Sequence, residues 1–139
     1  MTIEKSGREL LLEAVRKKDG SGVFYIYGSN EEEKRRIVKF VSLEAPDEMC
    51  RDFNFAERDA RELNGELFAE LLSQPIYLAG RRVVIIQCAD KLSDEARHAW
   101  ARFPEVAIEE VLLLLVNTPH TDRDESLARL EGIVLVECK

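Results

Sequence analysis

Residues 23–41 read VFYIYGSNEEEKRRIVKFV, and this stretch decides the fold. Its first five residues are an unbroken β-branched and aromatic run, which is typical of a strand buried on both faces. Gly28 then gives a tight turn, and Ser29 or Asn30 can cap a helix whose first turn holds three glutamates. The order of strand, glycine turn and helix predicts an α/β unit. The apolar stripe of this helix is expected to be Ile37, Val38 and Val41.

The same alternation continues along the rest of the chain. Residues 82–86 and 111–116 are again continuous hydrophobic runs, and residues 133–136 form a shorter one. Residues 52–57 alternate with period two around Phe53 and Phe55, as in a strand nearer a sheet edge. Five strands that alternate with helices predict a three-layer αβα fold around a five-stranded parallel sheet, with right-handed crossovers. The three uninterrupted runs at Val23, Val83 and Val111 are expected at its centre.

Four further helices are expected, one before the first strand and three between later strands. The first begins with a capping box at Ser6 and ends near Lys18, and a short one covers residues 125–130. The two others are capped by Asn64 and Ser93, and Pro104 ends the latter. Their expected core-facing residues are Leu67, Phe68, Leu71 and Leu72 in the former, and Ala96, Ala99, Trp100 and Phe103 in the latter.

Length, composition and net charge exclude several classes of protein. The 139 residues, 45% of them hydrophobic, suit one folded domain over residues 1–139. The net charge of −7 disfavours direct binding of nucleic acid. A signal peptide and an apolar run of membrane-spanning length are both absent from the sequence, so a cytoplasmic protein without membrane contact is expected. The three cysteines and two histidines show no metal-ligand spacing, so free thiols and no metal site are expected.

The turn after the first strand matches the phosphate-loop pattern G-x-x-x-x-G-K-[ST] only in part. Gly28 and Lys34 fit, but Glu33 replaces the second glycine and Arg35 replaces the magnesium-binding hydroxyl. The glutamates occupy the helix N-terminus where a phosphate would bind, and Asp90 follows its strand too late for a metal-binding acid. We therefore expect a degenerate loop, no bound cofactor and an exposed Lys34. A nucleotide-binding ATPase with an unusual phosphate loop remains the alternative.

Five segments together resemble the N-terminal domain of the δ subunit of bacterial DNA polymerase III. They are FYIYG (24–28), DFNF (52–55), LAGRRVVI (78–85), ADKL (89–92) and VLVEC (134–138), and they span nearly the whole chain in the family's order. The resemblance implies an AAA+-like clamp-loader domain without ATPase or other catalytic activity of its own. In that family this domain binds the sliding clamp, the β subunit of the polymerase, and helps to open its ring during DNA replication. The family's lid and collar domains, which contact the other loader subunits, have no counterpart here, and both a fragment and a naturally short relative fit the sequence.

The resemblance also implies a clamp-binding element just before the Arg-Arg strand. In the family two adjacent apolar side chains on this loop enter a pocket of the clamp, and Tyr77 and Leu78 occupy those positions, in swapped order relative to Leu-Phe. The alternative is that the apolar residues of the loop cover the core beneath it. Three consecutive apolar residues in a polar-flanked loop cannot all face inward, which favours binding. The expected element consists of Gln74, Pro75, Ile76, Tyr77 and Leu78.

Overall fold

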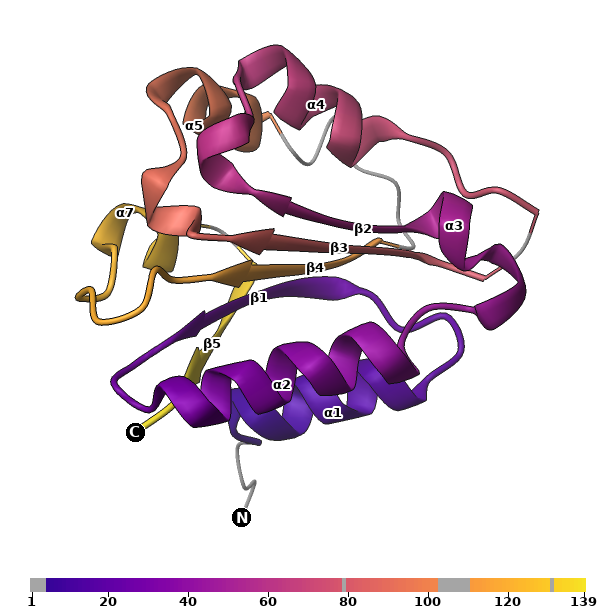
Figure 1. Ribbon diagram of the computed structural model, residues 1–139, viewed down its shortest axis with the longest axis horizontal. Helices are drawn as coiled ribbons and strands as arrows, with labels where there is room; N and C mark the ends of the chain where they lie inside the picture. Colours follow the sequence, from indigo (N-terminus) through magenta and orange to yellow (C-terminus); the bar gives the residue numbers. More distant parts are fainter. Residues whose placement is uncertain (1–4, 79, 103–110, 131) are drawn as a thin grey trace.

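The computed structural model describes residues 5–78, 80–102, 111–130 and 132–139, and within these ranges it holds five parallel strands in one sheet. The strand order is β2-β3-β4-β1-β5, and every neighbouring pair runs parallel (Figure 1). The three uninterrupted hydrophobic runs form the central strands, and residues of the 52–57 segment lie in an edge strand, as predicted. The strands are β1 (Gly22–Tyr27), β2 (Phe55–Asp59), β3 (Arg82–Gln87), β4 (Val111–Val116) and β5 (Ile133–Glu137).

Helices cover both faces of the sheet and complete the predicted three layers. On one face lie α1 (Gly7–Arg16) and α2 (Glu31–Glu44); on the other lie α4 (Gly65–Ser73), α5 (Asp94–Ala101) and the short α7 (Glu125–Ala128) (Figure 1). The predicted caps hold: the side chains of Ser6, Asn30, Asn64 and Ser93 each accept a hydrogen bond from a backbone N–H in the first turn. Shorter helical segments are η1 (Glu48–Cys50), α3 (Arg51–Asn54), η2 (Ala60–Glu62) and η3 (Ala89–Lys91).

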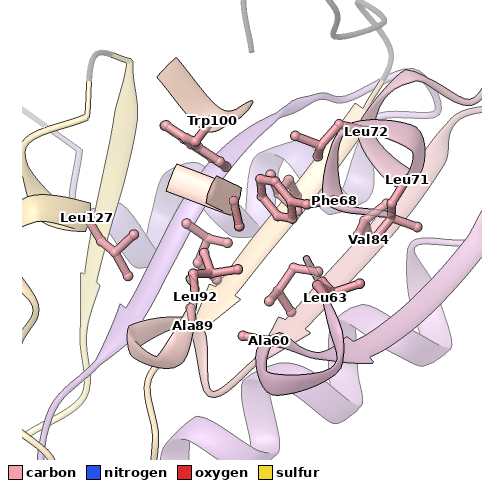
Figure 2. Packing of buried hydrophobic residues seen from close by; sticks show 14 of the residues in the cluster. Ala60, Leu63, Phe68, Leu71, Leu72, Val84, Ala89, Leu92, Trp100 and Leu127 are labelled. Atoms are coloured by element: carbon pink, nitrogen blue, oxygen red, sulfur yellow. The ribbon is translucent and has the colours of Figure 1, made fainter. Parts of the chain in front are cut away.

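Successive strand residues enter two different cores, which explains the uninterrupted hydrophobic runs of the central strands. Tyr25, Val84 and Leu113 pack toward α4 and α5, where Phe68 and Trp100 are also buried (Figure 2). The residues next to them in each strand, such as Ile26, Ile85 and Leu114, pack toward α1 and α2. Among the described residues, no helix is both long and apolar enough to cross a membrane.

Two of the predictions about local structure are wrong. The edge strand begins at Phe55 rather than Asp52, because residues 51–54 form the short helix α3, in which the Asn54 side chain bonds the backbone of Tyr77. Leu67 is half-exposed, because the core-facing side of α4 is filled by three other side chains, Phe68, Leu71 and Leu72. The predictions for Phe103 and Pro104 lie outside the described residues.

Arg81, the residue just before β3, holds the α1–α2 layer to the sheet. Its side chain is only 2% exposed, and its guanidinium donates hydrogen bonds to backbone carbonyls at the C-terminal ends of both helices. These carbonyls have no partner within a helix and carry its negative dipole end, so a buried cation satisfies them. The next residue, Arg82, donates to the carbonyl of Leu71 in α4. The carbonyl oxygens bound by Arg81 belong to Ala14, Val15, Lys17, Gly20 and Ala45.

We predict that the Arg81→Met substitution lowers the free energy of unfolding by about 3 to 5 kcal/mol, because it leaves several buried carbonyls without a donor. Urea unfolding followed by circular dichroism measures this loss. Arg61→Met is the control, since Arg61 forms only an exposed ion pair with Asp59, and it should change the stability by less than about 1 kcal/mol. Equal stability of the two variants would show that Arg81 does not hold the layer.

Candidate functional site

The carboxyl ends of β1 and β4 form the first candidate site. The chain leaves β1 toward the α2 face and leaves β4 toward the α7 face, so these adjacent strands diverge at a topological switch point, where α/β sheets bind ligands. Gly28 begins the turn after β1 with φ +123°, and an added Cβ would lie 2.1 Å from the carbonyl oxygen of Cys138. The glycine is therefore required by the close approach of the chain after β5.

Lys34 is buried in this region, which corrects the prediction that it is exposed. Its side chain is 3% exposed, and its Nζ lies 2.6 Å from Oε1 of Glu31, one turn earlier in α2. The same carboxylate accepts a hydrogen bond from the backbone N–H of His120. Burial raises the pKa of Glu31, but the bonds from Lys34 and His120 outweigh it and leave the pKa below its usual value. Lys34 is thus paired with the carboxylate of Glu31, which also links α2 to the loop after β4.

Asn30 and Glu33 in the same turn also have partners within the protein. The Asn30 side chain accepts a hydrogen bond from the Glu33 backbone N–H, which is one of the donors that a phosphate would need. The Glu33 carboxylate pairs with Arg8 of α1. A cavity of about 290 Å³ lies beside Lys34, with Gln87 and Asn117 among its lining residues. The turn from Gly28 to Lys34 therefore joins α1, α2 and the end of β5 through its own contacts.

The acidic and amide side chains at the ends of β3 and β4 also bind the backbone. Asp90 Oδ1 accepts a hydrogen bond of 2.7 Å from the N–H of Thr118. The side chain of Asn117, at the end of β4, accepts from the Tyr25 hydroxyl and donates to the carbonyl of Asp122. Burial raises the pKa of Tyr25 to about 12, so its hydroxyl remains a donor at neutral pH. These groups hold the loop after β4 in place.

The loop at residues 74–78 forms the second candidate site, at the opposite end of the sheet. It precedes β3, and Figure 1 shows it at the end where the parallel strands begin. Gln74 and Pro75 are exposed, and Gln74 Oε1 accepts a bond from Arg82. Ile76 is half-buried, whereas the side chains beyond it reach solvent: Tyr77 is 47% exposed and Leu78 is 80% exposed. The three apolar residues therefore do not all face inward.

Asn54, which sequence analysis missed, fixes this loop. Its side chain is fully buried, accepts a bond of 2.8 Å from the Tyr77 N–H and donates one of 3.0 Å to the Tyr77 carbonyl oxygen. Leu78 follows with φ +63°, a left-handed conformation that costs an ordinary side chain about 1 to 2 kcal/mol. The sequence feature that could have indicated this role is a polar residue, Asn54, between Phe53 and Phe55 in a strand-like pattern. The Asn54 side chain thus fixes the Tyr77 backbone, while the side chains of Tyr77 and Leu78 reach solvent.

Comparison with known proteins supports the fold at low sequence identity. No protein-family model matches the chain, and no curated protein matches it in sequence. The structure of the DNA clamp loader delta protein of Bacillus subtilis is similar with a TM-score of 0.67 and 14% identity, over 91% of this chain and 41% of that one. A DNA polymerase III gamma subunit-related protein of Thermotoga maritima gives a TM-score of 0.67 and 12% identity, over 97% of this chain and 46% of that one. The chain thus shares their α/β fold and spans less than half of their length.

The buried ion pair predicts a structural role for Lys34. We expect Lys34→Met to lower the free energy of unfolding by about 2 kcal/mol, because the Glu31 carboxylate, only 13% exposed, loses its cation. Urea unfolding measures the change. Lys39→Met provides the control on the exposed side of the same helix and should have little effect. A Lys34 variant as stable as the parent would contradict this role.

Proposed function

We propose that this chain is a non-catalytic clamp-loader module of the δ type, which binds the sliding clamp of a DNA polymerase and helps to open its ring during DNA replication. Residues 74–78 make the contact, and Tyr77 and Leu78 are the anchors. The observation that carries the proposal is the pair of protruding apolar side chains on a loop whose backbone is fixed by Asn54.

Two properties of the loop support this function. Binding energy at protein interfaces concentrates in a few apolar or aromatic side chains that become fully desolvated in a pocket. A loop that is already ordered before binding loses little conformational entropy in the complex, which favours affinity. The fold that the chain shares with a clamp loader delta protein and a gamma subunit-related protein is consistent with a place in a clamp-loader complex.

The alternative function is that of a nucleotide-binding, ATPase-like protein. The geometry at the carboxyl end of the sheet disfavours it, because Lys34, the Glu33 N–H and Asp90 are each engaged by the protein itself. A phosphate group would have to displace these partners, and the carboxylates at the start of α2 would repel it. We therefore propose that the domain has no catalytic activity and needs no cofactor.

We predict that ATP with Mg²⁺ does not raise the melting temperature of the protein. A ligand present at a hundred times its dissociation constant would stabilise the folded state by about 2.7 kcal/mol, which differential scanning fluorimetry detects readily. Magnesium chloride alone is the control for the effect of the ion. A saturable rise with ATP that disappears in the Lys34→Met variant would support the alternative function instead.

The double substitution of Tyr77 and Leu78 by alanine should weaken binding to the sliding clamp of the source organism by about a hundredfold or more. Each truncated anchor removes about 2 kcal/mol or more, and 1.4 kcal/mol corresponds to a tenfold change. Surface plasmon resonance with immobilised clamp measures the affinity. The melting temperature should change little, because both side chains reach solvent.

Leu10 and Phe40 provide a matched control, since they are a leucine and an aromatic residue on the outer helices, each exposed by a little over a third. Their double substitution by alanine should leave clamp affinity unchanged. Undiminished binding by the Tyr77 and Leu78 variant would exclude this loop as the anchor. A large fall in its melting temperature would show instead that the two residues belong to the core.

A further inference from the structure

The exposed apolar surface extends beyond the loop that carries Tyr77 and Leu78. Met49 in η1 is 93% exposed, and Phe53 in α3 is 59% exposed. Figure 1 shows α3 at the same end of the molecule as the segment that enters β3. We define the apolar patch as Met49, Phe53, Tyr77 and Leu78. Exposed apolar side chains that gather in this way mark binding surfaces more often than scattered ones do.

Several contacts join the two segments of the patch. The rings of Phe53 and Tyr77 lie with centroids 4.2 Å apart, and the adjacent Asn54 bonds the Tyr77 backbone. Gly80 has φ +93°, and an added Cβ would lie 3.3 Å from the Cβ of Asp47, two residues before Met49. The first two contacts hold α3 against the loop, and the third brings the segment that leads into η1 close to the start of β3.

The local chain path keeps Phe53 outward. In the strand expected from the sequence, Phe53 and Phe55 would share one face and Asn54 would point to the other. The helical turn of α3 instead buries Asn54 and leaves Phe53 beside Tyr77. The buried amide thus fixes the loop, and the aromatic ring enlarges the exposed surface.

The charges around the patch indicate the chemistry of its partner. Glu48 and Asp52 are exposed and stand next in sequence to Met49 and Phe53, in a chain whose net charge is −7. Met49 and Leu78 are the two most exposed side chains of the patch. Its complement is a concave apolar pocket with a positively charged rim.

We infer that Met49 and Phe53 form a second anchor for the protein bound by Tyr77 and Leu78, and that Glu48 and Asp52 face basic residues at the rim of its pocket. This inference rests on the proposed function, which names that protein as the sliding clamp. Phe53 also supports the ring of Tyr77, so the two aromatic residues act together.

Binding of the sliding clamp to a set of alanine variants tests the inference by surface plasmon resonance. Met49→Ala with Phe53→Ala should weaken binding by about tenfold, less than the loss on truncating Tyr77 and Leu78, while the melting temperature stays close to that of the parent. In a double-mutant cycle, Phe53→Ala should cost less affinity when Tyr77 is already alanine, because their ring contact is gone. Leu10→Ala with Phe40→Ala is again the control.

A second set of variants tests the role of the acidic residues beside the patch. The first of these is Glu48→Gln with Asp52→Asn. This variant should associate with the clamp about two- to fivefold more slowly at low salt, with little change in dissociation, because rim charges act mainly on the encounter. Glu62→Gln with Glu66→Gln removes two exposed acids away from the patch and should leave the association rate unchanged. Equal rates for the two acid variants would overturn the charged-rim part of the inference.

The remaining outcomes separate this inference from the proposed function. One outcome is that the parent protein binds the clamp and loses binding when Tyr77 and Leu78 are replaced by alanine, but keeps it when Met49 and Phe53 are replaced. In that case the second anchor is wrong and the proposed function stands. If the parent does not bind the clamp at all, both fail. Sedimentation equilibrium gives a third outcome: a dimer of the parent that the Met49 and Phe53 substitutions dissociate would assign the patch to a second copy of this chain and overturn the inference.

Discussion

The buried guanidinium of Arg81 is the interaction on which the arrangement of this molecule depends. It bonds backbone carbonyls from the ends of α1 and α2, and it precedes the first residue of β3. One side chain therefore sets how the helix layer meets the sheet and where the chain turns from the loop into its strand. Arg82 extends the same role to the other layer through Leu71 of α4. Arg82 also donates a hydrogen bond to the Gln74 side chain, so this pair of arginines is connected to the first residue of the loop.

The two ends of the sheet use their polar groups differently. At the carboxyl end, Lys34, Glu31 and Asp90 bind one another or the backbone and join loops from separate strands. At the amino end, Asn54 and Arg82 hold a loop from beneath and leave its apolar side chains in solvent. An α/β fold normally places its ligand at the carboxyl end. Here the arrangement of donors and acceptors favours a binding surface at the other end.

Sequence periodicity predicted the strands and layers well, because the central runs are hydrophobic on both faces and the helix caps act locally. The errors arise where a distant residue decides the structure. Asn54 leaves the expected strand because Tyr77 offers it a backbone partner, 23 residues away. Lys34 is buried because the loop after β4 covers the start of α2, as the bond from His120 to Glu31 shows. The hydrophobic periodicity of the sequence predicts neither the role of Arg81 nor the contact between Phe53 and Tyr77.

The apolar patch also has an energetic cost, which bears on its role. A left-handed backbone at Leu78 is unfavourable by about 1 to 2 kcal/mol, and its side chain gains almost no burial in return. Glycine or asparagine would relieve the backbone at that position, and a polar side chain would remove the exposed surface. Strain of this kind persists where surrounding contacts impose it, and it is concentrated at binding sites. The residue before Leu78 is held by the Asn54 side chain, so the strained backbone directly follows the segment that Asn54 fixes.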